Sequence, residues 1–165
     1  MLTLLKPASR APRATRITTE LPLVGTGLWA IDLETNGLDA ADPACFIVGI
    51  GLANDDDCFY INLLGASDER RDEIKTWLLA ARLVAFNSLF DGAFLQAWLG
   101  AWPGLEGCAY ALYKNLSSEG FTGQRWNLKD ASVSILGWPE RHDTRLRRWL
   151  VENGHVKGGT DAKRD

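Results

Sequence analysis

A short apolar run that ends in two carboxylates one residue apart, within positions 27–37 (GLWAIDLETNG), predicts a β-strand followed by a turn. Successive side chains of a strand point to opposite faces. One face carries Trp29, Ile31 and Leu33, and the other carries Leu28, Ala30, Asp32 and Glu34. Both faces begin with apolar residues, which predicts a strand covered on both sides. The two carboxylates would lie about 6.6 Å apart along the strand, close enough to share a cation.

Two further runs rich in β-forming residues, 45–53 and 58–63, are separated by the polar loop 54–57. This pattern predicts an antiparallel hairpin, which makes a three-stranded meander together with the first strand. The loop contains three consecutive aspartates, but it lacks the glycine and the final glutamate of an EF-hand calcium loop. We therefore interpret it as the tip of the hairpin.

Apolar residues recur at helical spacing within residues 67–81, which predicts an amphipathic helix with Ser67 as its N-cap. The short apolar run 83–86 predicts a strand parallel to the first, because a helix connects the two. A second helix is predicted at 87–99. Three later segments follow: 105–116 as a strand or turn leading into a helix, 126–136 as a helix capped by Asn127, and 144–151 as a short helix.

Asp91 lies at the start of the apolar stripe of the helix 87–99. The alternative is that Asp91 only complements the helix dipole, but this role does not explain why the residue lies on the apolar side of the helix. If the strand 83–86 neighbours the first strand, their carboxyl ends meet the start of this helix. We therefore expect Asp32, Glu34 and Asp91 to converge. Clustered acids repel each other, and a divalent metal ion would relieve the repulsion.

Composition narrows the class of protein. The chain has 165 residues, 46% of them apolar and 24% charged, as in a globular domain, and its formal charge is −3. This charge argues against a uniformly basic nucleic-acid binder but not against a metal-dependent nuclease. Three widely spaced cysteines indicate neither a disulfide framework nor a zinc site, and they favour a reducing compartment. No apolar run approaches the ~20 residues that span a bilayer, so we expect no membrane partner.

Residues 1–26 are predicted to be a flexible basic arm, because Lys6 and three arginines occur by position 17 without an acid. An organellar transit peptide and a phosphate-contacting tail are the alternatives. Residues 27–158 form the predicted domain. We interpret 159–165 as a tail or a truncated continuation.

The pair D-x-E on the first strand, followed by N-x-x-F-D at the start of a helix, resembles the DEDD-type 3′-to-5′ exonucleases of ribonuclease H-like fold. The resemblance is strongest to the proofreading domain of phage-type family A DNA polymerases. Asp32 and Glu34 match the first motif, and Asn87, Phe90 and Asp91 match the second, in which Asp91 comes 59 positions after Asp32. It implies an α/β fold: a mixed five-stranded sheet flanked by helices, here lacking the last helix.

The resemblance also implies a catalytic site with two Mg²⁺ or Mn²⁺ ions. Asp32 would bridge both ions, Glu34 would hold the ion that activates water, and Asp91 would hold the other. A third motif, a tyrosine or histidine followed by a fourth carboxylate, would orient the water and complete the metal shell.

Other family positions imply contacts with nucleic acid. Leu33 and Phe90 would wedge or stack against the terminal bases, and for Phe90 a place in the core is an equal alternative. Thr35 and Asn87 would hydrogen-bond the terminal nucleotide. Four basic residues either contact phosphates or only solvate the surface: Lys129, Arg145, Arg147 and Arg148.

The third motif is where this sequence departs from the family. Tyr110 and Tyr113 are not followed by an aspartate four positions later, and Asp161 lies one position too far from His155. A fragment of a longer protein, a split protein and a decayed domain are the three explanations.

Two functions remain open. The first is a proofreading-type 3′-to-5′ exonuclease acting on single-stranded DNA 3′ ends, with RNA trimming as a variant and a DNA polymerase domain as a partner. The second is an incomplete, non-catalytic module that binds DNA ends or scaffolds a polymerase. For either function we expect the cytoplasm of a bacterium or of a phage-infected host cell.

Overall fold

The computed structural model describes residues 16–17, 21, 27–117, 127–136, 148–149 and 151–153. The chain divides into two compact units, one of residues Pro12–Phe121 and one that combines Met1–Ala11 with Thr122–Asp165. The boundary at position 121 falls inside the predicted domain 27–158, and the proposed divisions at 26 and 158 stay predictions. Within the described part of the chain, none of the helices is both long enough and apolar enough to span a bilayer.

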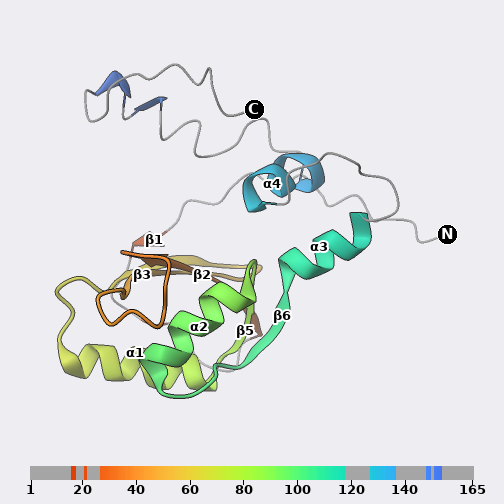
Figure 1. Ribbon diagram of the computed structural model, residues 1–165. Helices are drawn as coiled ribbons and strands as arrows, with labels where there is room; N and C mark the ends of the chain where they lie inside the picture. Colours follow the sequence, from red (N-terminus) through yellow and green to blue (C-terminus); the bar gives the residue numbers. More distant parts are fainter. Residues whose placement is uncertain are drawn as a thin grey trace. The chain divides into compact units, whose positions relative to one another are not determined.

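The first unit is built on a mixed sheet with the strand order β1-β4-β3-β2-β5-β6 (Figure 1). Its strands are β1 (Arg16–Ile17), β2 (Leu28–Thr35), β3 (Ile47–Ala53), β4 (Cys58–Asn62), β5 (Arg82–Ala85) and β6 (Leu105–Cys108). β2, β3 and β4 form an antiparallel meander, and β5 and β6 continue the sheet in parallel with β2. The predicted mixed five-stranded sheet is therefore confirmed.

β1 adds a sixth strand that the sequence pattern does not predict. Its two residues, Arg16 and Ile17, pair in parallel with Phe59 and Tyr60 of β4. They belong to the segment that we interpreted as a basic arm. Apart from Arg16, Ile17 and Leu21, the other positions between 1 and 26 lie outside the described residues.

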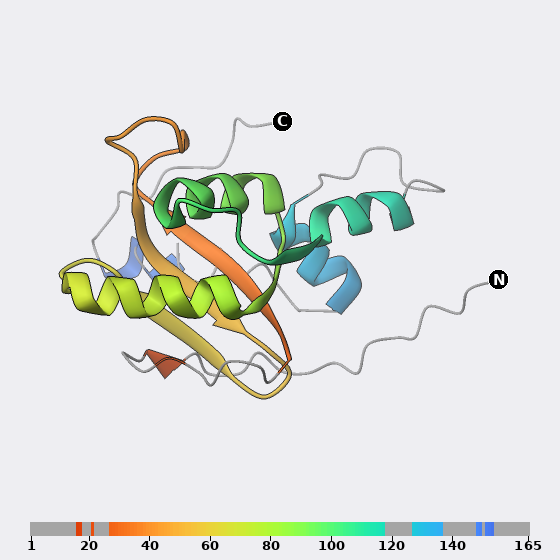
Figure 2. The same ribbon diagram turned by 90° about the horizontal axis from the view of Figure 1, so that it is seen from below.

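Three helices belong to the first unit: α1 (Asp68–Ala80), α2 (Ser88–Leu99) and α3 (Ala109–Ser117). The predicted cap of α1 is confirmed, since the Arg70 backbone N–H donates to Ser67 Oγ at 3.3 Å. α2 ends at Gly100, whose φ of 73° is the left-handed conformation that glycine adopts at low cost. Both α1 and α2 lie against one face of the sheet (Figure 2).

The core lies between this sheet face and the two helices. The Trp29 ring packs against Phe59 at 5.8 Å and against Trp77 of α1 at 6.0 Å between ring centroids. Phe94 and Leu95 of α2 belong to the same buried cluster. The predicted apolar stripes of both helices are therefore confirmed.

The other face of β2 is open, which corrects one prediction. Leu28 is 45% exposed, and Ala30, Asp32 and Glu34 are also exposed. The prediction is based on the apolar residues at the start of both faces. It is wrong because α1 and α2 both pack on the face of Trp29. The two carboxylates therefore project from the uncovered face of the sheet.

In the second unit, α4 (Leu128–Leu136) is the predicted helix at 126–136. Its predicted cap is confirmed, since the Asp130 N–H donates to Asn127 Oδ1 at 2.9 Å. Four residues of the later segment are helical: Arg148, Trp149, Val151 and Glu152. The remainder of the predicted helix 144–151 lies outside the described residues.

Candidate active site

The site forms where β2 extends beyond its parallel neighbour β5. The pairing of these strands ends at Ile31 and Ala85, whereas β2 continues to Thr35. After Ala85 the chain leaves the sheet and begins α2 at Ser88. The backbone of β2 beyond Ile31 therefore has no strand partner on this side, and its polar groups need another acceptor or donor.

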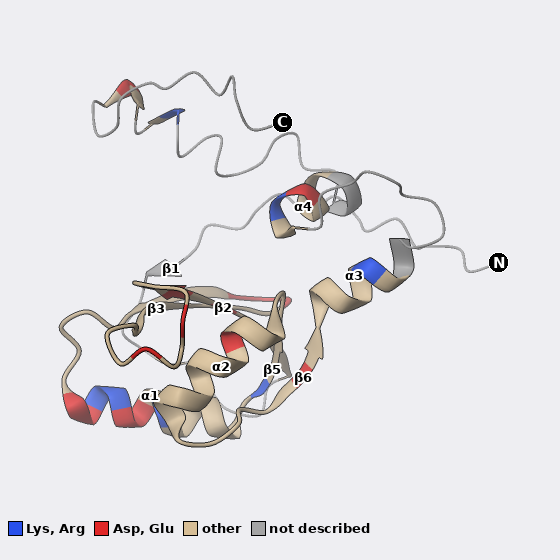
Figure 3. Cartoon of the chain, in the orientation of Figure 1, with Lys and Arg blue, Asp and Glu red and all other residues tan. Residues whose placement is uncertain are grey.

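Asp91 of α2 supplies that acceptor. The Leu33 backbone N–H donates to Asp91 Oδ1 at 3.3 Å, over a separation of 58 positions in the chain. Asp91 is only 3% exposed. It is the one charged residue of a helix that is otherwise apolar or neutral (Figure 3). The hydrogen bond fixes the carboxylate against the carboxyl end of β2.

The pKa of Asp91 is affected by the charge of Asp32. Burial, and then the negative charge of Asp32, raise the pKa of Asp91 from its ordinary 3.8 to about 6. Backbone N–H groups of Leu33, Asp91 and Asn87 oppose this rise without cancelling it. The charge of Asp32 therefore acts on the Asp91 carboxyl, while the predicted convergence of the two carboxylates on one metal ion stays a prediction.

Glu34 projects from the same face of β2 as Asp32, two residues closer to the strand end. Within the described part of the chain, no group of three His, Cys, Asp or Glu residues is arranged to hold a metal ion. The convergence of all three carboxylates therefore stays a prediction.

The donor set of Asp32 and Asp91 fits a hard divalent cation. Mg²⁺ is usually held by one or two carboxylates, and water and substrate phosphates fill the remaining positions. A cation would also offset the repulsion that raises the pKa of Asp91. Two carboxylates suffice for one such ion.

The four predicted nucleic-acid contacts occupy different environments. Leu33 is 7% exposed and belongs to the core, so its backbone rather than its side chain faces the site. Phe90 is half-buried and packs against Phe94 at 5.1 Å between ring centroids. Thr35 Oγ1 donates to the Gly37 carbonyl at 2.6 Å, within the turn after β2. Asn87 is exposed at the N-cap of α2, where its side chain makes no capping hydrogen bond.

Of the four predicted phosphate contacts, Lys129 lies in α4 and Arg148 is exposed, both in the second unit. Arg145 and Arg147 lie outside the described residues.

Two exposed leucines beside the motifs escaped the sequence analysis. Leu38, in the loop after β2, is 87% exposed, and Leu89, in the first turn of α2, is 79% exposed. A signal for both exists in the sequence: Leu38 is an apolar residue within a polar turn, and Leu89 falls off the apolar stripe of its helix.

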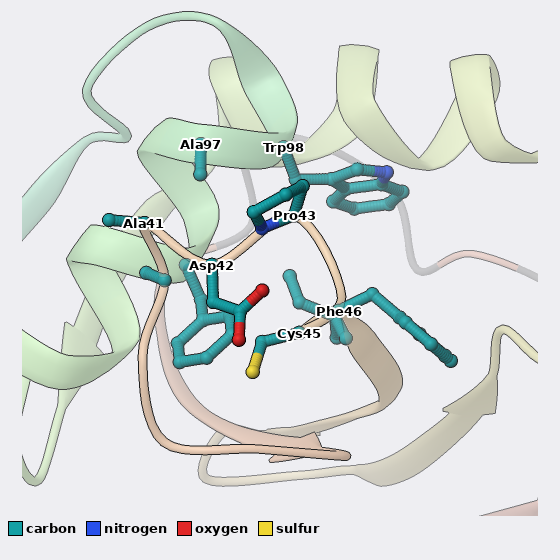
Figure 4. Close-up of a pocket in the computed structure, with 10 residues that line it drawn as sticks. Ala41, Asp42, Pro43, Cys45, Phe46, Ala97 and Trp98 are labelled. Atoms are coloured by element: carbon teal, nitrogen blue, oxygen red, sulfur yellow. The ribbon is translucent and has the colours of Figure 1, made fainter.

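A pocket of about 230 Å³ lies between α2 and the loop 36–46 (Figure 4). The Asn36 side chain braces this loop, since its Nδ2 donates to the Ala44 carbonyl at 2.9 Å and its Oδ1 accepts from the Phe46 N–H at 2.6 Å. Phe94 and Trp98 of α2 form one wall, and none of the three predicted catalytic residues lines the cavity.

Comparison with known proteins identifies the fold but not the family. No protein-family model and no curated protein sequence matches the chain. Similar solved structures include Brucella melitensis NrnC bound to pGG, with 21% identity over 75% of this chain and 59% of that chain, at a TM-score of 0.55. NrnC with bound Mg²⁺ is 17% identical over 87% of this chain and 83% of that chain, also at 0.55.

A third similar structure is the POL domain of Pol1 from M. smegmatis in complex with DNA primer-template and dNTP. It is 16% identical over 70% of this chain and 20% of that chain, at a TM-score of 0.55. Identities this low show the fold alone. The chain therefore has an α/β fold of the ribonuclease H-like type, built on the mixed sheet described above.

Proposed function

We propose that this chain is a metal-dependent 3′-to-5′ exonuclease domain that removes nucleotides from single-stranded DNA ends. The observation that carries the proposal is Asp91, a buried carboxylate fixed to the backbone of β2 and repelled by Asp32. A buried acid held against a second acid destabilises the fold unless a cation or a proton joins it. This arrangement favours a functional role over a structural one.

The comparisons support the substrate class and the metal. Of the proteins with this fold, NrnC has been solved with Mg²⁺ and with pGG, and Pol1 with DNA primer-template. We infer a nucleic-acid substrate and Mg²⁺ or Mn²⁺ for this chain as well, because its carboxylates are hard oxygen donors. A proofreading role with a DNA polymerase domain as partner rests on the motif resemblance.

In the mechanism, Asp32 and Asp91 would hold one divalent ion, and Asp32 and Glu34 a second. Such ions neutralise charge on the reacting phosphate and make a water more acidic. The Leu33 N–H keeps the Asp91 carboxylate in one orientation. Glu34, on the exposed face of β2, would hold the ion that activates the attacking water.

The terminal nucleotide would lie at the start of α2. The Asn87 side chain, which makes no capping hydrogen bond, would bind it, and the half-buried Phe90 ring would stack against its base. Thr35 and the backbone of Leu33 border the same end of β2.

The second candidate is a non-catalytic module that binds 3′ ends. It is favoured by one observation, namely that the sequence contains no match to the third exonuclease motif. Incomplete positioning of the reacting groups typically lowers rates by about 10²-fold or more. We therefore expect slow digestion by this chain.

The test is digestion of a 5′-labelled single strand, as DNA and as RNA of the same sequence, with Mg²⁺ or Mn²⁺ and with a chelator. We expect a ladder that shortens from the 3′ end, requires metal and disappears in Asp91→Ala. Glu73→Ala, an exposed acid of α1, is the matched control and should digest normally. Metal-dependent binding without shortening would favour the second candidate, and digestion that survives Asp91→Ala would refute the assigned site.

A further inference from the structure

On β3, the strand next to β2, two glycines stand opposite the two carboxylates of β2. In the antiparallel register, Asp32 lies opposite Gly51 and Glu34 lies opposite Gly49. Residues directly opposite each other in a sheet share a face. The space above these two glycines on β3 is therefore available to side chains from the next strand, β4.

Tyr60 of β4 fills that space. A β-carbon added to Gly49 would lie only 2.0 Å from Tyr60 Oη and 2.5 Å from the ring carbon that bears it. Tyr60 itself lies opposite Gly51, so its ring leans diagonally toward the carboxyl end of β2. Glycine at position 49 is thus required for the phenol to lie flat across β3.

This placement brings the phenol hydroxyl beside Glu34. Opposed β-carbons in a sheet are about 4.5–5.5 Å apart. Since Tyr60 Oη is 2.0 Å from the β-carbon position of Gly49, it lies within about 7.5 Å of the Glu34 β-carbon. The Glu34 carboxylate extends beyond its β-carbon, so a single water molecule can bridge it and the Tyr60 hydroxyl.

Two other polar side chains of the same face are already engaged. Asn62 Oδ1 accepts the Leu64 N–H at 2.9 Å, within the turn that follows β4. The Arg82 guanidinium, at the far end of β5, donates to both oxygens of Glu106 at 2.6 and 2.8 Å. Tyr60 therefore presents its hydroxyl toward Glu34 without competition from these two side chains.

We propose that Tyr60 is a positioning residue whose hydroxyl shares with the Glu34 carboxylate the water that attacks the phosphodiester. The inference rests on the proposed function. The water oxygen forms a bond to phosphorus as the bond to the 3′ oxygen of the preceding nucleotide breaks. The water gives up one proton to solvent, the departing 3′ oxygen takes a proton from solvent, and the released nucleotide keeps its 5′ phosphate. Tyr60 only hydrogen-bonds the water and exchanges no proton.

The first test is Tyr60→Phe, which keeps the ring and removes the hydroxyl. We expect kcat to fall roughly 10- to 100-fold with KM unchanged, because an ill-oriented water lowers the rate without weakening substrate binding. The rise in melting temperature on adding Mn²⁺ should stay that of the wild type, because the hydroxyl acts on the water rather than on the ion. A structural role of Tyr60 would instead lower the melting temperature without metal.

The second variant changes β3 and displaces the same Tyr60 hydroxyl. In Gly49→Ala the new methyl group displaces Tyr60 Oη, so kcat should fall as in Tyr60→Phe. The double variant should lose no more than either single variant, because both remove one interaction. Gly107→Ala is the matched control: its added β-carbon lies 3.5 Å from Val84 Cγ2, an ordinary contact, and activity should be retained.

The outcomes separate the inference from the proposed function. Wild-type digestion with Tyr60→Phe within about twofold in kcat would overturn the inference and leave the exonuclease assignment standing. A loss in Tyr60→Phe that comes with a reduced Mn²⁺ response would also overturn it, since the residue would then act on the metal site. Absence of metal-dependent digestion by the wild type would overturn the proposed function, and the role of Tyr60 with it.

Discussion

Replacing Asp91 with asparagine removes a buried negative charge and keeps an oxygen that can accept the Leu33 N–H. In the folded protein the pKa of Asp91 is raised from 3.8 to about 6 by burial and by Asp32. The folded state therefore holds this proton more tightly than the unfolded state. As a consequence, the free energy of unfolding falls as the pH rises from 3.8 through 6, and the loss persists at higher pH.

The magnitude follows from the size of the shift. A rise of about two pKa units corresponds to about 3 kcal/mol of lost stability at pH 7. Asp91→Asn should recover most of this, which for a chain of this size is about 5–10 °C in melting temperature. Near pH 4 the wild-type carboxyl is protonated in the fold, so the two proteins should melt together.

The assay is thermal unfolding of the wild type and of Asp91→Asn between pH 4 and 8 in the presence of a chelator. Glu73→Gln is the control, because that acid is exposed on α1, where it pairs with Arg70. We expect the melting temperatures of wild type and Asp91→Asn to separate between pH 4 and 6 and to stay apart above that range. Parallel curves, or a variant less stable than the wild type at pH 7, would refute the electrostatic reasoning.

Three further predictions concern the stability of the fold. Mg²⁺ or Mn²⁺ at about 100 times its Kd should stabilise the wild type by about 2.7 kcal/mol, and a melting temperature unaffected by either ion would count against the site. Asp32→Asn should stabilise the metal-free protein, since it removes one cause of the raised pKa of Asp91, and should abolish the metal response. Trp29→Ala should destabilise by about 3–5 kcal/mol, because the ring packs between Phe59 and Trp77, and a change near zero in denaturant unfolding would contradict this account of the core.

The sequence predicts the main strands of the sheet because the segments of β2, β3 and β4 are rich in β-forming residues and are separated by polar turns. It also places Asp91 on the inner side of α2, since the helical period fixes which residues share a face. β1 escapes prediction because two residues carry no period, and its pairing with β4 is a tertiary contact.

The features of the site that the sequence does not predict are contacts between elements. The hydrogen bond from Leu33 to Asp91 uses a backbone N–H, which a pattern of side chains does not reveal. The position of Tyr60 over Gly49 depends on the register of β3 and β4, which residue types alone do not fix. The uncovered face of β2 depends on where the helices pack.

The most direct test of the exonuclease assignment is a single-turnover reaction on a single DNA strand labelled in its 3′-terminal nucleotide. With Mn²⁺, the wild type should release the labelled mononucleotide as the first product, and the chelator should stop the release. Asp91→Ala should release none on the same time scale. Release of longer labelled fragments first, or equal release by Asp91→Ala, would contradict a 3′-to-5′ exonuclease built on Asp32 and Asp91.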